Sequence, residues 1–180
     1  MFNLFVGNIM IDTLEAQREK TASRPIRELV KRELLNAAQR RQLEETARQR
    51  GLTNVVFTGR QPKNTMPDWG ASSDANLVHL RVSELFTTVM PSKIFESAGC
   101  ARPIIMRVDG YAKNLVMKAE AGVDMIPESA WSLVECVKKL ADDQGLCRRL
   151  GENAYQNIAL VFNRDSQAND YIRILEKLVK

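Results

Sequence analysis

The 180-residue sequence predicts an α/β protein built on a parallel β-sheet with helices on both faces. After residue 50, short apolar runs alternate with segments of helical period, and this alternation is typical of βαβ units with parallel strands. The length suits one domain, since domains commonly have about 100–200 residues. A content of 44% hydrophobic and 27% charged residues is ordinary for a globular domain with a buried core.

The expected strands are short runs rich in β-branched or aromatic residues, bounded by glycine or polar residues. Right-handed crossovers bring the carboxyl ends of parallel strands to one edge of the sheet, so the loops after them are expected to line a ligand site. The strands are expected at residues 4–7, 54–57, 75–80, 103–106 and, with a weaker pattern, 122–126.

The expected helices share apolar residues at three- and four-residue spacing. They lie at residues 26–50, 64–71, 91–98, 110–119 and 129–142, and two more follow between residues 146 and 178. The break between the last two falls at residues 162–164, with Asn163 or Asp165 as the cap. The sequence does not settle whether residues 11–24 form an ordered structure. We therefore divide the chain into an irregular segment with the first strand, 1–33, and a main domain, 34–180.

Composition excludes several kinds of protein. No apolar stretch reaches the roughly 18 residues of a membrane span, and the apolar start lacks a basic lead and a cleavage site, so a cytoplasmic location is expected. Three cysteines without CxxC spacing and a single histidine argue against a disulfide or zinc framework, and we expect no metal or other cofactor.

The charge of +4 is concentrated in residues 18–50, which hold ten Lys or Arg and five Asp or Glu. Such a face can bind a nucleic acid or the inner surface of a membrane. The interleaved acids and the lack of aromatic residues favour a solvated helix face, so nucleic acid is not an expected partner, whereas peripheral membrane contact stays open.

The residues that indicate chemistry lie at 85–99, after the strand expected at 75–80. Pro91 suits the first turn of a helix, because its missing N–H needs no partner there. The free backbone amides of Ser92 and Lys93, the helix dipole and the Lys93 ammonium would form an anion site suited to phosphate. Glu96, one turn further, could accept hydrogen bonds from a ribose diol. The alternative is a capped helix on which Lys93 and Glu96 are ordinary surface residues.

The run TVMPSKIFE at 88–96, followed by GCARPII at 99–105, resembles the donor-site signature of GT-B glycosyltransferases, family four, notably those of bacterial O-antigen and capsule synthesis. Other segments agree with that family in order and spacing, and the similarity extends over roughly residues 34–180. These segments are GLTNVVFTG at 51–59, MPDWGASSD at 66–74, LADD at 140–143 and LGENA at 150–154.

The resemblance implies a Rossmann-like domain that forms one half of a GT-B fold and binds a nucleotide-diphosphate sugar. In that case Glu96 would bind the ribose hydroxyls, and the amides of Ser92 and Lys93 would hold the pyrophosphate. Gly59 and Arg60 would lie against the base. His79, at a strand end, would approach the donor or simply pack in the core; the sequence leaves both open.

The donor run also contains Met90, Pro91 and Thr88, and here the sequence departs from the family. Many members carry a glutamate that contacts the transferred sugar at the position of Thr88. A hydroxyl offers no charged acceptor, so a deoxy or N-acetylamino sugar is favoured over a hexose with its full set of hydroxyls. No residue is assigned a catalytic role.

A second departure is that the family's amino-terminal acceptor domain is absent from this sequence, and residues 11–32 do not match.

The leading interpretation is the donor-binding domain of a retaining glycosyltransferase that uses an NDP-sugar, with UDP first, and a polysaccharide or lipid-linked acceptor. The alternative is a non-catalytic nucleotide- or partner-binding module. Expected partners are the nucleotide sugar and either an acceptor domain or a second copy. The sequence has no DxD-like metal motif, and Asp142-Asp143 is interpreted as a helix end.

Overall fold

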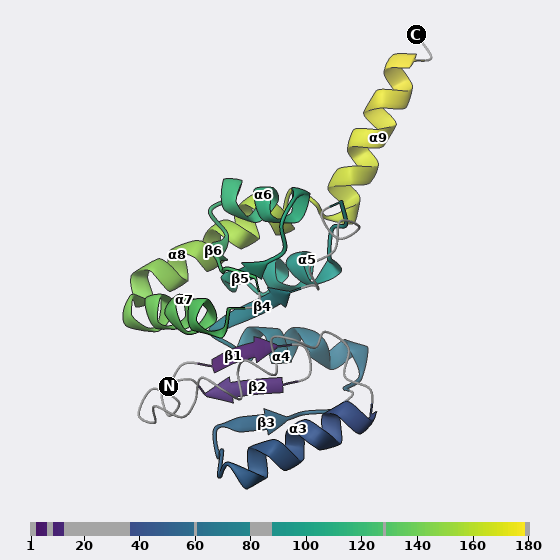
Figure 1. Cartoon of the computed structure of the whole chain (residues 1–180). Helices are drawn as coiled ribbons and strands as arrows, with labels where there is room; N and C mark the ends of the chain where they lie inside the picture. The colour runs from purple at the N-terminus through teal and green to yellow at the C-terminus, as the bar shows by residue number, and fades with distance from the viewer. Residues whose placement is uncertain are drawn as a thin grey trace.

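The computed structural model describes residues 3–6, 9–12, 37–59, 61–79, 88–127 and 129–178 (Figure 1). Its strands form one six-stranded sheet in the order β3-β2-β1-β4-β5-β6. All five expected strands are present within a few residues of their expected bounds. The strands are β1 (Asn3–Val6), β2 (Ile9–Asp12), β3 (Val55–Phe57), β4 (Ala75–His79), β5 (Ile104–Arg107) and β6 (Gly122–Asp124).

The strand that the sequence did not predict is β2. The parallel arrangement is confirmed for β1, β4, β5 and β6, but β2 runs antiparallel to both β1 and β3. Val6 pairs with Ile9, so only Gly7 and Asn8 connect β1 to β2, and these residue types favour a two-residue hairpin. This hairpin places part of the segment 1–33 in the centre of the sheet.

The helices confirm the sequence predictions at 64–71, 91–98, 110–119 and 129–142, whereas of the helix expected at 26–50 only the portion from Ala37 onward lies among the described residues. A 3-10 turn, η1, precedes α4, and a π-helical segment, η3, continues α8. The helical elements are α3 (Ala37–Gln49), η1 (Lys63–Thr65), α4 (Met66–Ser72), α5 (Ser92–Gly99), α6 (Tyr111–Lys118), α7 (Ala130–Asp142), α8 (Gln144–Ala154), η3 (Tyr155–Ala159) and α9 (Arg164–Leu178).

Side-chain caps define several helix boundaries. The Ser129 hydroxyl accepts a hydrogen bond from the Ser132 amide at 3.1 Å and begins α7. The Asp143 carboxylate accepts one from the Leu146 amide at 2.8 Å, so Asp142-Asp143 is a helix junction, as expected. Of the two candidate caps for α9, Asn163 is the one used: its Oδ1 accepts from the Ser166 amide at 2.7 Å.

Two apolar clusters cover the two faces of the sheet, as the fold class predicts. The side chains of each strand are divided between the two clusters, because successive side chains point to opposite faces of the sheet. Leu77 and Ile105 join α7 and α8 in one cluster, while Val78 and Met106 join α5, α6 and η3 in the other. Both clusters contain residues without exposed surface, so each face of the sheet has its own packed core.

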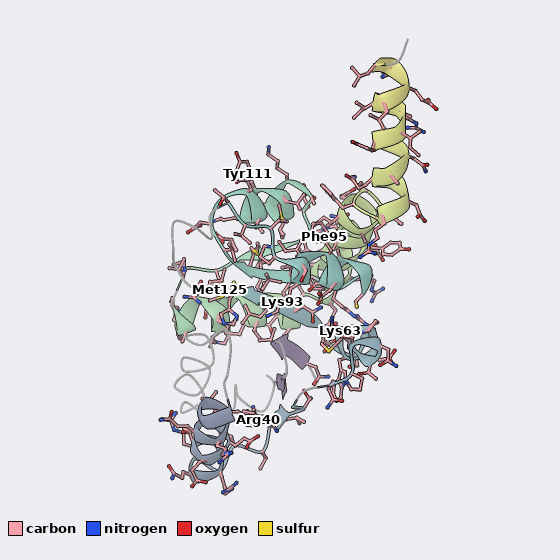
Figure 2. The ribbon with its side chains drawn as sticks, turned by 90° about the vertical axis from the view of Figure 1, so that its right-hand side faces the viewer. Arg40, Lys63, Lys93, Phe95, Tyr111 and Met125 are labelled. Atoms are coloured by element: carbon pink, nitrogen blue, oxygen red, sulfur yellow. The ribbon has the colours of Figure 1, made fainter. Side chains whose placement is uncertain are left out.

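Helix α9 differs from the other helices because it runs away from the body of the domain (Figures 1 and 2). It has no buried residue. Its exposed side chains include Tyr171, Ile174, Leu175 and Leu178, which share one face of the helix. Among the described residues, no helix is both long and apolar enough to cross a membrane.

Candidate functional site

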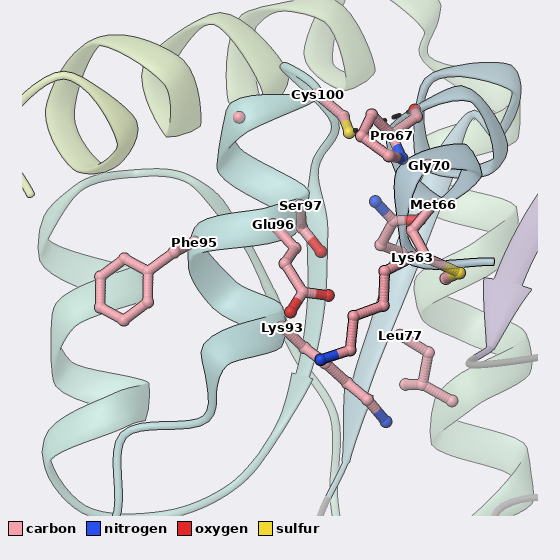
Figure 3. A pocket seen from close by; sticks show the side chains of 12 residues that line it. Lys63, Met66, Pro67, Gly70, Leu77, Lys93, Phe95, Glu96, Ser97 and Cys100 are labelled. Carbon is pink, nitrogen blue, oxygen red and sulfur yellow. Dashed lines mark hydrogen bonds between the residues drawn. The ribbon is translucent and has the colours of Figure 1, made fainter. Parts of the chain in front are cut away.

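A cavity of about 630 Å³ opens between α4, α5 and β4, at the surface of the domain. Its volume lies within the range of roughly 300–1,000 Å³ that is typical of small-molecule sites. Most of its lining is apolar, and polar groups are concentrated where Lys63, Lys93 and Glu96 lie (Figure 3). The other lining residues are Met66, Pro67, Gly70, Asn76, Leu77, Phe95, Ser97, Gly99 and Cys100.

Of the residues that the sequence singled out, Glu96 and Lys93 line this cavity. Glu96 is exposed, and its Oε1 accepts a hydrogen bond from the Ser92 hydroxyl at 3.1 Å. Lys93 is half-buried one turn earlier on the same helix. Because both side chains come from α5 and face one cavity, a ligand seated there can contact a carboxylate and an ammonium together.

The start of α5 differs slightly from the expectation. Pro91 is the N-cap, with extended backbone angles of φ −65° and ψ 131°, and the helix begins at Ser92. A proline side chain cannot cap, and no described residue forms a side-chain cap bond here, so the first amides of the helix remain available to a ligand or to water. Thr88 and Met90, just before this start, are exposed.

His79 is a buried residue at the carboxyl end of β4, only 4% exposed, and neither ring nitrogen has a hydrogen-bond partner among the described residues. Its register partner on β5 is Arg107, which is equally buried. Burial, followed by the charges of Arg107 and Lys93, lowers the pKa of His79 to about 4. His79 is therefore neutral at physiological pH. It is not among the cavity-lining residues.

Gly59 lies apart from the cavity, against α3. Its φ of +68° favours glycine, and a Cβ at this position would lie 2.7 Å from Nη1 of Arg40. Arg40 in turn pairs with Glu44 at 2.7 Å. Arg60, the neighbour expected to lie against a base, is outside the described residues.

The sequence analysis missed two further cavity residues, Lys63 and Cys100. Lys63 comes from η1 and belongs to no periodic pattern, so only the docking of α4 on α5 reveals it. Burial raises the pKa of the Cys100 thiol, which makes it a poor nucleophile. The described residues contain no group of three or more His, Cys, Asp or Glu that could hold a metal ion.

Comparison with known proteins agrees with this arrangement. The family described as glycosyl transferases group 1 matches residues 36–157. The O-antigen chain mannosyltransferase C of Escherichia coli is 26% identical over 145 residues, which cover 77% of this chain and 37% of that protein. The sucrose-phosphate synthase of Thermosynechococcus elongatus superposes with a TM-score of 0.63 at 18% identity, over 86% of this chain and 42% of that one.

The similarity to the synthase shows the fold: an α/β domain that corresponds to a Rossmann-like half of a GT-B protein. The chain spans less than half the length of either of these proteins. The family match covers well over half of the chain and includes α4, α5 and the cavity between them. The chain therefore belongs to the glycosyl transferases group 1 family.

Proposed function

We propose that this chain is the carboxyl-terminal, donor-binding domain of a retaining glycosyltransferase of family four. It takes a sugar from an NDP-sugar, with UDP as the first candidate nucleotide, for transfer to a polysaccharide or lipid-linked acceptor. The observation that carries the proposal is the cavity between α4 and α5, where Glu96 and Lys93 adjoin apolar walls next to the uncapped start of α5.

The chemistry of each group fits one part of the donor. The apolar walls suit a base, and the Glu96 carboxylate suits the two neutral hydroxyls of ribose. A carboxylate repels phosphate, so the diphosphate belongs beyond Glu96, toward the start of α5. There the negative charge that develops on the leaving nucleotide would be stabilised by the backbone amides of Ser92 and Lys93 and by the Lys93 ammonium. In this proposal no metal ion is needed for that step.

Two observations bear on the identity of the transferred sugar. Thr88, exposed before α5, offers a hydroxyl where a charged acceptor would grip a sugar hydroxyl, which favours a deoxy or N-acetylamino sugar. The E. coli relative is named for mannosyl transfer, so mannose is a second candidate. His79 would act on the donor only as a neutral side chain behind Lys93.

A second candidate function is a non-catalytic module that binds nucleotide or a partner. This function requires only the nucleotide-binding cavity described above and no acceptor site. In both proposals the exposed apolar face of α9 is a contact surface for an acceptor domain or a second copy, since exposed apolar patches commonly mark interfaces.

A thermal-shift panel with UDP, GDP and ADP tests the proposal. A ligand that binds only the folded state at a hundred times its Kd adds about 2.7 kcal/mol to stability, which raises Tm by several degrees. We expect one diphosphate to stabilise the wild type and the Glu152→Ala control, whose exposed glutamate is on α8, but not the Glu96→Ala variant. No shift with any nucleotide would refute donor binding. Binding without release of sugar from the matching NDP-sugar would favour the non-catalytic module.

A further inference from the structure

Lys63 approaches Lys93 and Glu96 at one edge of the cavity, although it comes from a different element. Lys63 extends from η1, whereas the other two extend from α5, and all three side chains end at the same side of the cavity (Figure 3). The convergence is produced by tertiary packing alone. No residue of η1 is buried, so Lys63 is not held there by a role in the core.

The packing of α4 on α5 fixes the distance between these groups. Cys100, at the end of α5, approaches α4 so closely that a Cβ at Gly70 would lie 2.8 Å from the Cys100 sulfur. At the other end of α4, the Thr65 amide and hydroxyl both donate to the carbonyl of Pro62, at 3.0 and 2.9 Å, and hold η1 in shape. Lys63 therefore belongs to a turn that these hydrogen bonds hold in place at the edge of the cavity.

The charges at this edge do not balance. Two ammonium groups adjoin one carboxylate, and neither Lys63 nor Lys93 forms an ion pair with any residue that the structure describes. The Glu96 carboxylate accepts its hydrogen bond from Ser92 instead. Two like charges at one edge repel each other, and an anion between them removes that repulsion. The cavity thus favours a ligand with negative charge at this end and apolar surface at the other.

We propose that Lys63 is a diphosphate-binding residue of the donor site and acts as a pair with Lys93. The inference rests on the proposed function and extends it to a residue outside α5. With the base between α4 and α5 and the ribose at Glu96, the diphosphate reaches the edge where both ammonium groups can donate to its oxygens. Lys63 then orients the leaving group from the side opposite the start of α5.

The test compares nucleoside diphosphates with their nucleosides by isothermal titration calorimetry. UDP, GDP and ADP, together with uridine, guanosine and adenosine, are titrated into the wild type, Lys63→Gln, Lys63→Arg and Lys118→Gln. The last is a matched control, because Lys118 is an exposed lysine on α6 outside the cavity. For the diphosphate that binds, Lys63→Gln should raise Kd about tenfold or more, the usual effect of losing a charge-assisted hydrogen bond.

The expected pattern is specific to a phosphate contact. The nucleoside affinity should stay unchanged in Lys63→Gln, Lys63→Arg should retain most of the diphosphate affinity, and Lys118→Gln should match the wild type. An unchanged Kd of Lys63→Gln for the diphosphate would overturn this inference and leave the proposed function standing. Equal weakening of diphosphate and nucleoside would also overturn it. If the wild type binds none of the three diphosphates, the proposed function itself fails.

Discussion

The rings of Phe95 and Phe162 pack against each other with their centroids 5.7 Å apart and their planes inclined at 52°. Phe95 belongs to α5 and lines the cavity, whereas Phe162 lies in the turn between η3 and α9. Through this contact α5 packs against the turn from which α9 leaves the domain. One aromatic contact therefore joins the helix of the proposed site to the turn that precedes α9.

Replacing Phe162 with Ala removes this aromatic pair. Such a pair contributes about 0.5–1.5 kcal/mol beyond its buried area, so Tm should fall by about 1–6 °C in a thermal melt monitored by circular dichroism. Tyr171→Ala is the matched control, because this ring is exposed on α9 and should change Tm little. Equal Tm values for the two variants would show that the Phe95 contact contributes nothing to stability.

The single histidine predicts how stability depends on pH. The folded-state pKa of His79 is lowered to about 4 from 6.5, so the unfolded chain binds more protons between these values. Stability should therefore fall as pH drops through this window, by about 2 kcal/mol between pH 7 and pH 5. Urea unfolding at the two pH values measures the difference.

The control for this dependence is His79→Gln, which keeps a polar side chain of similar reach but does not titrate. Its stability should change much less between pH 7 and pH 5, whatever its absolute value. If the variant and the wild type lose the same free energy of unfolding on acidification, His79 is not the group responsible.

At Gly151, in α8, the structure leaves no room for a larger side chain. This glycine is buried in α8, and a Cβ there would clash with the carbonyl oxygen of Ala101. Because a backbone atom blocks the space, Gly151→Ala should destabilise the domain by about 1–3 kcal/mol in urea unfolding, the usual cost of overpacking.

Gly99 offers the matched substitution. It also belongs to a helix, as the last residue of α5, but a Cβ there meets nothing within 4 Å. Gly99→Ala should cost no stability and could gain up to about 1 kcal/mol, since Ala has the higher helix propensity. A similar loss in both variants would point to backbone effects rather than to the contact with Ala101.

The exposed apolar face of α9 predicts self-association of the isolated chain. Leu175 lies in the middle of this face, so Leu175→Lys should shift the sedimentation velocity profile toward monomer at high protein concentration. Asn169→Lys adds the same charge outside that face and should leave the profile unchanged. A wild-type chain that is strictly monomeric at high concentration would contradict the prediction.

Local pattern was sufficient to predict most elements of this fold. The strands β4 and β5 are fully buried and mainly apolar, and α7 combines helical periodicity with the Ser129 cap, so each carries its own signal. The donor helix α5 was visible because a proline, two helix-start residues and a glutamate occur at fixed spacing. The strand β2 was missed: its pairing with β1 is local, but its other partner, β3, lies more than forty residues further along the chain.

The sequence by itself determined the α/β class, the order of the strands and helices apart from β2, and the presence of Lys93 and Glu96 on one helix, because these depend on periodicity and short-range spacing. Only the tertiary structure decided that Lys63 joins them, that His79 is buried and neutral, and that α9 has no buried residue. Those properties depend on how distant elements pack and exclude water, and no local pattern of residues encodes that packing.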